Sequence, residues 1–312
     1  MKSWVTHNIL MKVIKTVSLK NLGKKYQGKT RDFYIKGGTR IIVSTDRISA
    51  FDRNLGFIPH KGQVLSQLAM FWFNKTKHII QNHIISNPHP NVLIVKNVKL
   101  IPIEMVVRGY ISGVTNTSIW GSYQKGERVI YGIKFPNGLK KNQKLKKPVI
   151  TPTTHPKAGS GLHDERLTKK EILNKKLLDK KMYELLERIS LKLFALGTQL
   201  CSKRGIILVD TKYEFGMYKG QVMLVDEIHT PDSSRFWIKK TYKERFKKGL
   251  EPQNFDKEFL RLWFKKRGYT GEGKPPKMPQ EFINKVRRRY VSIYQKITGH
   301  KFIPDKTKIS KL

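Results

Sequence analysis

The stretch 205–237 constrains the fold most, because two apolar runs within it each end in acidic residues. The first run, 206–209, is apolar or β-branched and follows a glycine, which predicts a buried strand. Successive side chains of a strand point to opposite faces, so Asp210, Lys212 and Glu214 are expected to share one face. Two carboxylates with an ammonium between them should therefore stand on one wall of a sheet.

The second apolar run, 222–225, ends at Asp226 and is separated from the first strand by a glycine-bearing turn. This spacing predicts an antiparallel hairpin that brings the acids together. Glu214 and Asp226 share a face if the turn is centred on a residue, Lys219 or Gly220, or if a bulge corrects the register. Converging carboxylates suit Mg²⁺, which proteins hold with one or two carboxylates plus substrate phosphates. A solvated hairpin edge is the alternative.

The formal net charge is +40, from 63 Lys and Arg against 23 Asp and Glu in 312 residues. Taken alone, such a charge predicts binding to nucleic acid or to an anionic surface. The basic residues are nevertheless spread along the whole chain, as in 140–147, 167–181 and 302–312. A diffuse excess attracts any anionic ligand, so composition bias is favoured over a specific nucleic-acid site.

The apolar and aromatic contents, 38% and 10%, are typical of a folded globular protein. Cys201 is the only cysteine, which excludes an intramolecular disulfide and indicates a reducing compartment. No apolar run reaches the roughly 18 to 20 residues of a membrane span. The N-terminus also lacks a signal-peptide pattern. We therefore expect a cytoplasmic protein with one large domain or two closely packed ones.

Residues 26–35, followed by the strand-like run 40–45, predict a small hairpin with Gly28 near its turn. Lys29 and Arg31 stand at alternate positions and should point to one face. A glycine lets the backbone approach a phosphate, and the two cations would neutralise it. The pattern is neither a Walker-A loop nor a dinucleotide fingerprint, so it indicates a phosphate site only weakly.

Polar side chains follow three further segments. Strand 40–45 leads into hydroxyls and acids that end at Asp52, typical of a turn or of a ligand-contacting loop. The apolar strand 101–107 delivers Arg108 at its end, a candidate fork for carboxylate or phosphate, with a surface salt bridge as the alternative. The stretch 151–165 is rich in proline and glycine and predicts a long loop of the kind that is usually functional.

Helical periodicity predicts most of the remaining elements. Apolar residues recur at three- and four-residue steps in 62–78, 168–203, 254–267 and 279–299, and 118–124 contains a short helical piece. The segment 168–203 is expected to be helical throughout. Residues 1–20 are expected to be a poorly ordered lead-in, and the last dozen residues a loose basic end.

Taken in order, six motifs resemble the phosphoribosylaminoimidazole-succinocarboxamide synthases, or SAICAR synthetases. They are GKTRDFY (28–34), STDRISAFD (44–52), EMVVRGY (104–110), TPTT with HDE (151–165), VDTKYEFG (209–216) and DEIHTPDSSRFW (226–237). The resemblance implies an ATP-dependent ligase of purine biosynthesis (EC 6.3.2.6). Such an enzyme joins the carboxylate of carboxyaminoimidazole ribonucleotide (CAIR) to the amino group of L-aspartate, giving SAICAR, ADP and phosphate. The motif order disfavours two alternatives, a nucleic-acid-binding protein and a small-molecule kinase.

The resemblance also implies roles for motif residues, with ATP and Mg²⁺ as cofactors and CAIR and L-aspartate as partners. Lys212 would orient the CAIR carboxylate, and Asp210 would position Lys212. Glu214 and Asp226 would hold Mg²⁺ against the ATP phosphates. The other ATP contacts implied are Gly28, Lys29, Arg31 and Lys157. The substrate contacts implied are Ser49, Asp52, Arg108, Ser112, Asp164 and Arg235.

Two positions depart from the family pattern. Members commonly carry serine as a phosphate contact where this chain has Val114, so Ser112, Thr115 or a backbone amide would take that role. The loop 151–165 is longer than expected, which affects the assignment of Lys157. Oligomeric state, monomer or homo-oligomer, stays open.

The expected fold is α+β. An antiparallel N-terminal sheet carries the glycine-bearing hairpin, and a larger mixed α/β region follows, with an ATP cleft between them. The expected divisions are a lead-in at 1–20, a nucleotide-covering region at 21–108, a substrate and metal region at 109–300 and a basic tail at 301–312.

Overall fold

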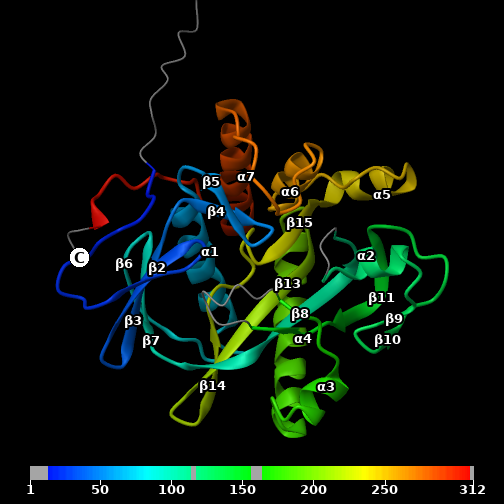
Figure 1. Cartoon of the computed structure of the whole chain (residues 1–312), viewed down its shortest axis with the longest axis horizontal. Coiled ribbons are helices and arrows are strands. Elements are labelled where there is room, and N and C mark those ends of the chain that lie inside the picture. The colour runs from blue at the N-terminus through cyan, green and yellow to red at the C-terminus, as the bar shows by residue number, and fades with distance from the viewer. Residues whose placement is uncertain (1–12, 114–116, 156–163, 310–312) are drawn as a thin grey trace, which may run out of the picture.

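The computed structural model describes residues 13–113, 117–155 and 164–309. Two main antiparallel sheets dominate this part of the chain, and helices pack around them (Figure 1). The α+β class expected from the sequence is confirmed. The strand β8, Lys99–Ile111, runs across the division expected at residue 108, so that division stays a prediction.

The first sheet contains the glycine-bearing hairpin at one edge and has the strand order β1-β2-β3-β7-β6. Its strands are β1 Lys25–Gln27, β2 Arg31–Lys36, β3 Thr39–Ser44, β7 Val92–Lys96 and β6 Ile84–His89. A two-stranded ribbon, β4 Arg47–Ala50 with β5 Arg53–Phe57, and the helix α1, Lys61–Thr76, lie between β3 and β6 in sequence. The predicted helix 62–78 is thus confirmed.

The second sheet is built on two long strands, β8 and β13 (Ile206–Tyr218), which pair antiparallel at its centre. The strand order is β11-β8-β13-β14, with β12 beside β8 and β15 beside β13. The additional strands are β11 Gln143–Ile150, β12 Thr153–Thr154, β14 Gln221–Val225 and β15 Ser234–Ile238. A small ribbon, β9 Val129–Ile130 with β10 Ile133–Lys134, stands apart.

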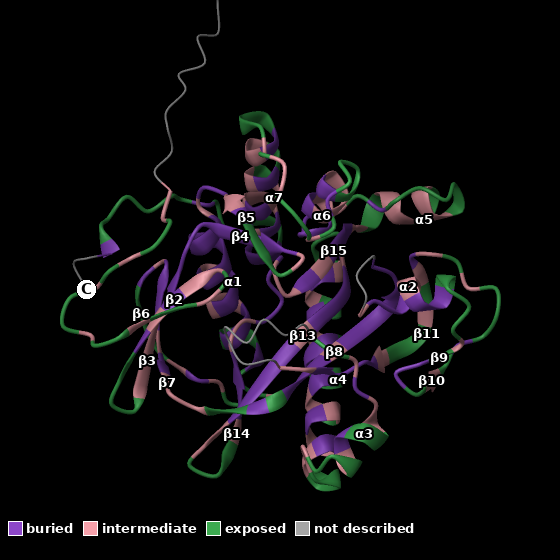
Figure 2. Ribbon diagram, in the orientation of Figure 1, coloured by how far each residue is buried: buried purple, intermediate pink, exposed green. Residues whose placement is uncertain are grey.

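The remaining helices lie around this sheet or, in the case of α7, against α1 (Figure 1). They are α2 Ile119–Gln124, α3 Lys169–Asn174, α4 Lys180–Lys203, α5 Lys239–Lys247, α6 Glu258–Lys265 and α7 Gln280–Thr298. One large apolar core includes α1, α4 and both long strands, with Trp72, Tyr213 and Phe236 fully buried. Figure 2 shows β8 and β13 buried along most of their length, so charged side chains on them are held by packed backbone.

The segment 168–203, predicted as one helix, forms two helices with a break at 175–179. Thr168 begins α3 with a capping box, and Asp179 begins α4 by accepting a 2.7 Å hydrogen bond from the Met182 amide. Lys176 in the break has φ 50°, which ends the first helix. Thr168 and Asp179 each bind the free backbone amides at the start of a helix. The apolar repeat is therefore divided between two helices and does not form a single one.

In the C-terminal half, one predicted helix needs its bounds corrected, and one further helix was not predicted. The helix expected at 254–267 begins only at Glu258, whose amide donates to Asp256 at 2.8 Å. The helix α5 was not predicted, because it buries none of its residues and so shows no apolar stripe.

The ends of the described chain are packed, which corrects the expectation of loose ends within 13–20 and 301–309. Ile14 and Asp46 exchange hydrogen bonds of 2.8 and 2.9 Å. Gln63 donates to the Ile303 carbonyl at 2.8 Å. Ile309 is buried against Val43 and its neighbours. Buried apolar side chains among the lysines attach the C-terminal segment to the rest of the protein.

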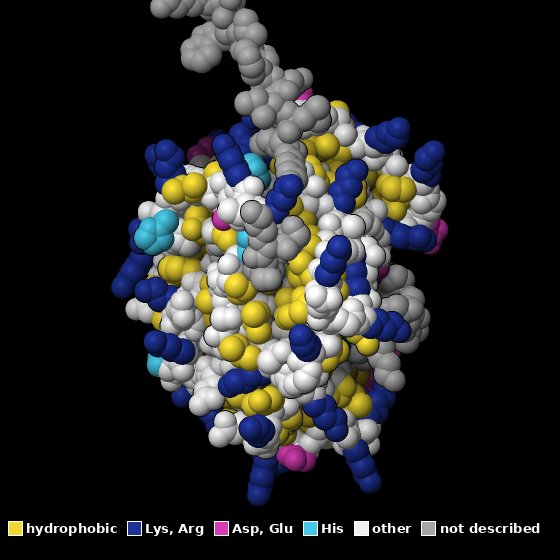
Figure 3. All heavy atoms as spheres, turned by 90° about the vertical axis from the view of Figure 1, so that its left-hand side faces the viewer, with side chains coloured by type: hydrophobic (Ala, Val, Ile, Leu, Met, Phe, Trp, Pro, Cys, Tyr) yellow, Lys and Arg dark blue, Asp and Glu magenta, His cyan; other side chains and the backbone are white. Residues whose placement is uncertain are grey.

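Lys and Arg side chains are dispersed over the face shown in Figure 3, with apolar patches between them. This distribution agrees with the diffuse charge read from the sequence. Among the described residues, the helices are all too short or too polar to cross a membrane.

Candidate functional site

The register of β8 and β13 places five charged residues on one face of the second sheet. Arg108 lies opposite Asp210, and Glu104 lies opposite Glu214. Opposite residues of an antiparallel pair point to the same face, and alternation adds Lys212 between the two acids of β13. The predicted wall of Asp210, Lys212 and Glu214 is confirmed, and β8 adds a cation and an acid to it.

Lys212 is held between the two glutamates. Its Nζ lies 2.5 Å from Oε1 of Glu104 and 2.5 Å from Oε1 of Glu214. The lysine side chain is 31% exposed, whereas those of the glutamates are 4% and 10% exposed. Burial opposes its charge, but Glu214 and Glu104 outweigh burial and raise the pKa of Lys212 above its ordinary value. Lys212 is therefore an ammonium on the open side of buried carboxylates.

The two opposed glutamates differ in their protonation. Burial raises the pKa of Glu214 to about 7, Asp226 and Glu104 add to this, and Lys212 opposes it. Burial acts on Glu104 too, but Lys212 and a hydrogen bond from His155 lower its pKa below the ordinary value. Glu104 is thus ionised, and Glu214 takes up a proton near neutral pH.

His155 completes a group with the two glutamates. Its Nδ1 lies 3.2 Å from Oε1 of Glu104 and 3.6 Å from Oε2 of Glu214. One donor atom of each of the three residues lies within 4.8 Å of the others. Thr153 donates to Oε2 of Glu104 at 2.9 Å and fixes that carboxylate. Two carboxylates and an imidazole at such distances form a candidate cation site.

The β13–β14 hairpin does not have the register required for Glu214 and Asp226 to share a face by alternation. Tyr218 pairs with Gln221, so the turn is centred between Lys219 and Gly220, and Val225 lies opposite Glu214. Both turn residues have positive φ, 49° and 78°, as a type I′ turn requires. A two-residue turn of this type matches the twist of the two strands. Its centre therefore lies between Lys219 and Gly220 and not on either residue.

Asp226 reaches the site by leaving the strand. It follows the last residue of β14 and has φ 62°, a left-handed conformation that ends the alternation. Its carboxylate pairs with Arg31 of the glycine-bearing hairpin, and Glu227 Oε2 lies 2.8 Å from Nη2 of the same arginine. The charge of Asp226 still acts on Glu214 and Lys212. As a metal ligand it stays a prediction.

The strands β1 and β2 pair antiparallel on either side of Gly28 and so form the hairpin. The Gly28 amide donates to the Arg31 carbonyl at 2.8 Å, and Lys29 Nζ lies 2.5 Å from Oδ1 of Asp52. Beneath it, the buried Arg47 donates to the carbonyls of Gly28 at 3.1 Å and Lys29 at 3.3 Å. The turn is therefore tied to the protein interior through its carbonyl groups.

Asp210 stands in a row with two arginines across three strands, opposite both Arg108 and Arg235. Nη1 of Arg108 lies 3.5 Å from its Oδ2, and Arg235 pairs with the same oxygen. Glu258 lies 3.5 Å from Nε of Arg235. The structure pairs Asp210 with arginines and Lys212 with glutamates, so it does not bring Asp210 onto Lys212.

The remaining predicted residues fall in different places. Ser49 is buried in β4, and Ser112 is buried just after β8, where its Oγ has no hydrogen-bond partner within the described chain. Burial and the charge of Glu104 raise the pKa of Asp164, which couples it to the glutamate cluster. Lys157, Val114 and Thr115 lie outside the described residues.

Sequence reasoning missed Glu104 and His155, and also a buried carboxylate, Asp232. Asp232 Oδ2 lies 2.8 Å from Lys61 Nζ and 2.9 Å from Lys257 Nζ. Despite burial, these lysines hold the pKa of Asp232 below its ordinary value. Glu104 could have been found, because it alternates with Arg108 on an apolar strand. The lysines that pair with Asp232 come from α1 and from the start of α6, so no local sequence pattern predicts these ion pairs.

Known proteins resemble this chain along most of its length. The description "SAICAR synthetase" belongs to the family whose profile matches residues 24–277. A phosphoribosylaminoimidazole-succinocarboxamide synthase of Legionella pneumophila (strain Paris) is 51% identical over 286 residues, covering 91% of this chain and 90% of the relative. The Saccharomyces cerevisiae SAICAR synthase complexed with SAICAR superposes with a TM-score of 0.78 at 31% identity, covering 93% of this chain and 99% of that one. A type-2 SAICAR synthetase in complex with ADP gives 0.67 at 26% identity, covering 90% and 100%.

Proposed function

This chain belongs to the SAICAR synthetase family, and from that premise we propose that it joins the CAIR carboxylate to the amino group of L-aspartate at the expense of ATP. The observation that carries the proposal within the structure is Lys212, an ammonium held on the open side of Glu104 and Glu214. A reaction among anions needs a cation at the point where they meet.

The chemistry requires activation of a carboxylate. An oxygen of the CAIR carboxylate attacks the γ-phosphorus of ATP, the bond to ADP breaks, and an acyl phosphate forms. The aspartate nitrogen then attacks the acyl carbon and loses a proton, while phosphate leaves with the former carboxylate oxygen. Lys212 orients the attacking carboxylate and offsets the charge that gathers on the transferred group.

The residues present fit Mg²⁺, the cofactor expected with ATP. Burial raises the pKa of Glu214 to about 7, and the neighbouring carboxylates of Asp226 and Glu104 add to this rise, so three acids act on one another at this place. Carboxylate oxygens are the ligands that Mg²⁺ prefers. Glu214 and Asp226 would hold the ion, with Glu104 as a neighbouring acid. When bound, Mg²⁺ would neutralise phosphate charge.

ATP would bind between the two sheets, at the contact of the glycine-bearing hairpin with the end of β14. This placement is supported by the ion pairs of Arg31 with Asp226 and Glu227, which join the two sheets there. Lys29 would meet the phosphates from the turn, and the Gly28 backbone would approach them closely. Lys157 stays a prediction from the family resemblance.

The CAIR anions fit the arginine row. Arg108 and Arg235 flank the carboxylate of Asp210, and Glu258 lies beside Arg235, so two guanidinium groups stand together at this end of the face. Guanidinium forks suit phosphate and carboxylate alike. Ser49, Asp52 and the unpartnered Ser112 would supply hydrogen bonds to the nucleotide. Asp164 is proposed to receive the aspartate amine.

A coupled assay of ADP release tests the proposal. The purified chain is supplied with Mg²⁺, ATP and CAIR, with and without L-aspartate. We expect ADP release that depends on aspartate and matches SAICAR formed. Release that ignores aspartate would indicate an ATPase or kinase and would overturn the proposal. The cytoplasmic location and the oligomeric state stay predictions.

A further inference from the structure

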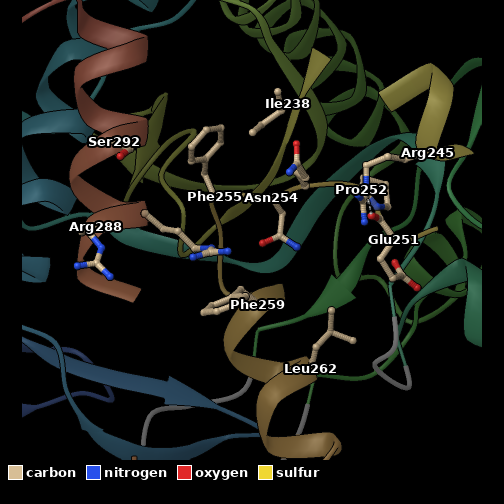
Figure 4. Close-up of a pocket in the computed structure, with 12 residues that line it drawn as sticks. Ile238, Arg245, Glu251, Pro252, Asn254, Phe255, Phe259, Leu262, Arg288 and Ser292 are labelled. Carbon is tan, nitrogen blue, oxygen red and sulfur yellow. Dashed lines mark hydrogen bonds between the residues drawn. The ribbon is translucent and has the colours of Figure 1, made fainter. Parts of the chain in front are cut away.

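A second pocket, of about 470 Å³, lies away from the lysine–glutamate face, among α5, α6, α7 and the segment 251–255 (Figure 4). Its volume falls within the range of about 300–1,000 Å³ that small-molecule sites occupy. None of its lining residues belongs to the site described above. Its chemistry therefore has to be explained separately.

Two lining side chains present buried polar atoms without partners. Asn254 Oδ1 can only accept a hydrogen bond and Arg289 Nε can only donate one, and neither has a partner in the part of the chain that the structure describes. Buried polar groups are nearly always paired, because an unpaired one loses its bonds to water without replacement. One acceptor and one donor at the same pocket call for a ligand with the opposite pair.

The pocket also has a positive balance. Arg245, Arg288 and Arg289 line it against a single acid, Glu251. Glu251 is 45% exposed and already paired with Lys141 outside the pocket. Within the described residues, Arg288 and Arg289 form no ion pair. An anion would supply the partner that these guanidiniums lack.

The walls favour a flat ligand. The Arg289 guanidinium lies 3.5 Å from the ring centroid of Phe259, and Phe282 also stacks on that ring at 5.2 Å, so a flat ligand would stack on the guanidinium rather than on the ring. Phe255 and Leu262 add apolar area to the same pocket (Figure 4). Guanidinium and phenyl surfaces of this kind stack well on heteroaromatic rings.

We propose that this pocket is a second anion site that binds a nucleoside monophosphate with an amino-bearing base. The base lies against Phe255 and the Arg289–Phe259 stack and donates an exocyclic N–H to Asn254 Oδ1. The phosphate accepts from Arg289 and Arg288. The assignment goes beyond the ligase activity and does not depend on it, because the residues belong to a different surface. A planar carboxylate shares part of this chemistry.

Calorimetric titration of the full chain with AMP tests the site, with saturating ADP and Mg²⁺ present to occupy the ATP cleft. We expect one saturable AMP site. Loss of the charged hydrogen bonds in Arg289→Ala should weaken AMP binding about tenfold or more. The control Lys296→Ala removes one exposed charge from the same helix and should change affinity by less than about twofold. No saturable binding, or equal affinity in Arg289→Ala, would overturn the site.

Further probes identify the ligand class. Inorganic phosphate and benzoate, titrated in the same way, should bind much more weakly than AMP; equal binding by either would overturn the nucleotide assignment. Ser292→Phe keeps Arg289 and fills the pocket, so it should also abolish AMP binding; a variant that a melting curve shows to be folded and that binds AMP as the parent does would contradict the site. AMP should slow amide exchange in 251–262, and protection confined to the ATP cleft would contradict the proposal.

Discussion

Glu104 and Glu214 lie directly opposite each other on adjacent strands, and the single ammonium of Lys212 lies 2.5 Å from an oxygen of each. Two opposed buried acids repel each other, and one cation cannot fully neutralise two carboxylates. The negative charge on this face is therefore only partly compensated, and an incoming cation or substrate would change it. The strand register creates this relationship, since the residues are far apart in sequence.

Lys212→Ala should abolish turnover while leaving ATP binding measurable. The proposed role of the ammonium lies in the transition state, and loss of such a group costs about 10²- to 10³-fold in kcat. Single-turnover rates and ADP affinity measured separately give the two effects. Lys243→Ala, on an exposed position of α5, is the matched control. An affinity loss as large as the rate loss would assign Lys212 to ATP binding instead.

Glu214→Gln should alter the pH dependence of stability. Burial raises the pKa of Glu214 to about 7, above the ordinary 4.5, so the folded state holds a proton that the unfolded chain has lost. The stability linked to this proton is complete below the unfolded pKa and disappears as the pH rises through the folded pKa. The glutamine variant lacks that decline. Its Tm relative to the parent should therefore be higher at about pH 8 than at about pH 5.

The same melting series with Glu244→Gln is the control, because that acid is 69% exposed on α5. Its Tm difference from the parent should stay nearly constant with pH. A flat difference for Glu214→Gln as well would mean that Glu214 is ionised throughout this range.

Asp226→Asn should weaken the Mg²⁺-dependent part of ADP binding by about tenfold or more, since it removes a proposed ligand. Because Asp226 also pairs with Arg31, the control is Glu227→Gln, which loses an Arg31 contact without losing that ligand. Titrations at several Mg²⁺ concentrations separate the two. If the Mg²⁺ dependence of Asp226→Asn matches that of the parent, Asp226 does not bind the metal.

Arg47→Lys should raise the KM for ATP by about tenfold and change kcat little. The substitution keeps the buried charge but cannot bridge the carbonyls of Gly28 and Lys29, which Arg47 now holds together. The turn would then lose its fixed position over the phosphates. Steady-state kinetics with ATP varied measures both constants, and a fall in kcat at unchanged KM would contradict this positioning role.

Local patterns predicted the part of the site that lies on one strand. Alternation alone placed Asp210, Lys212 and Glu214 on a common face, because strand geometry fixes it whatever the partner strand. The opposed Glu104 could not be placed in this way, since the pairing of β8 with β13 is set by packing between distant segments. The position of Asp226 depended on a turn centre and on a left-handed residue, neither of which the apolar pattern records.

For the helices too, sequence patterns predicted part of the packing and missed the rest. The stripe in α4 predicted burial of Leu186 and Leu193, but the buried line continues through Gly197, where an added Cβ would lie 2.4 Å from His229. A close approach of this kind does not recur at a regular spacing in the sequence, so periodicity cannot predict it. The bridge of Lys61 and Lys257 to Asp232 was equally unpredictable, because three separate elements meet there only in the folded chain.

Transfer of ¹⁸O from the CAIR carboxylate to phosphate examines the proposed chemistry at its first bond. CAIR labelled in both carboxylate oxygens is turned over with ATP and L-aspartate, and the inorganic phosphate is analysed by mass spectrometry. If the carboxylate is activated as an acyl phosphate beside Lys212, each phosphate should carry one labelled oxygen and each SAICAR amide should retain the other. SAICAR formed with unlabelled phosphate would contradict activation by ATP at this carboxylate.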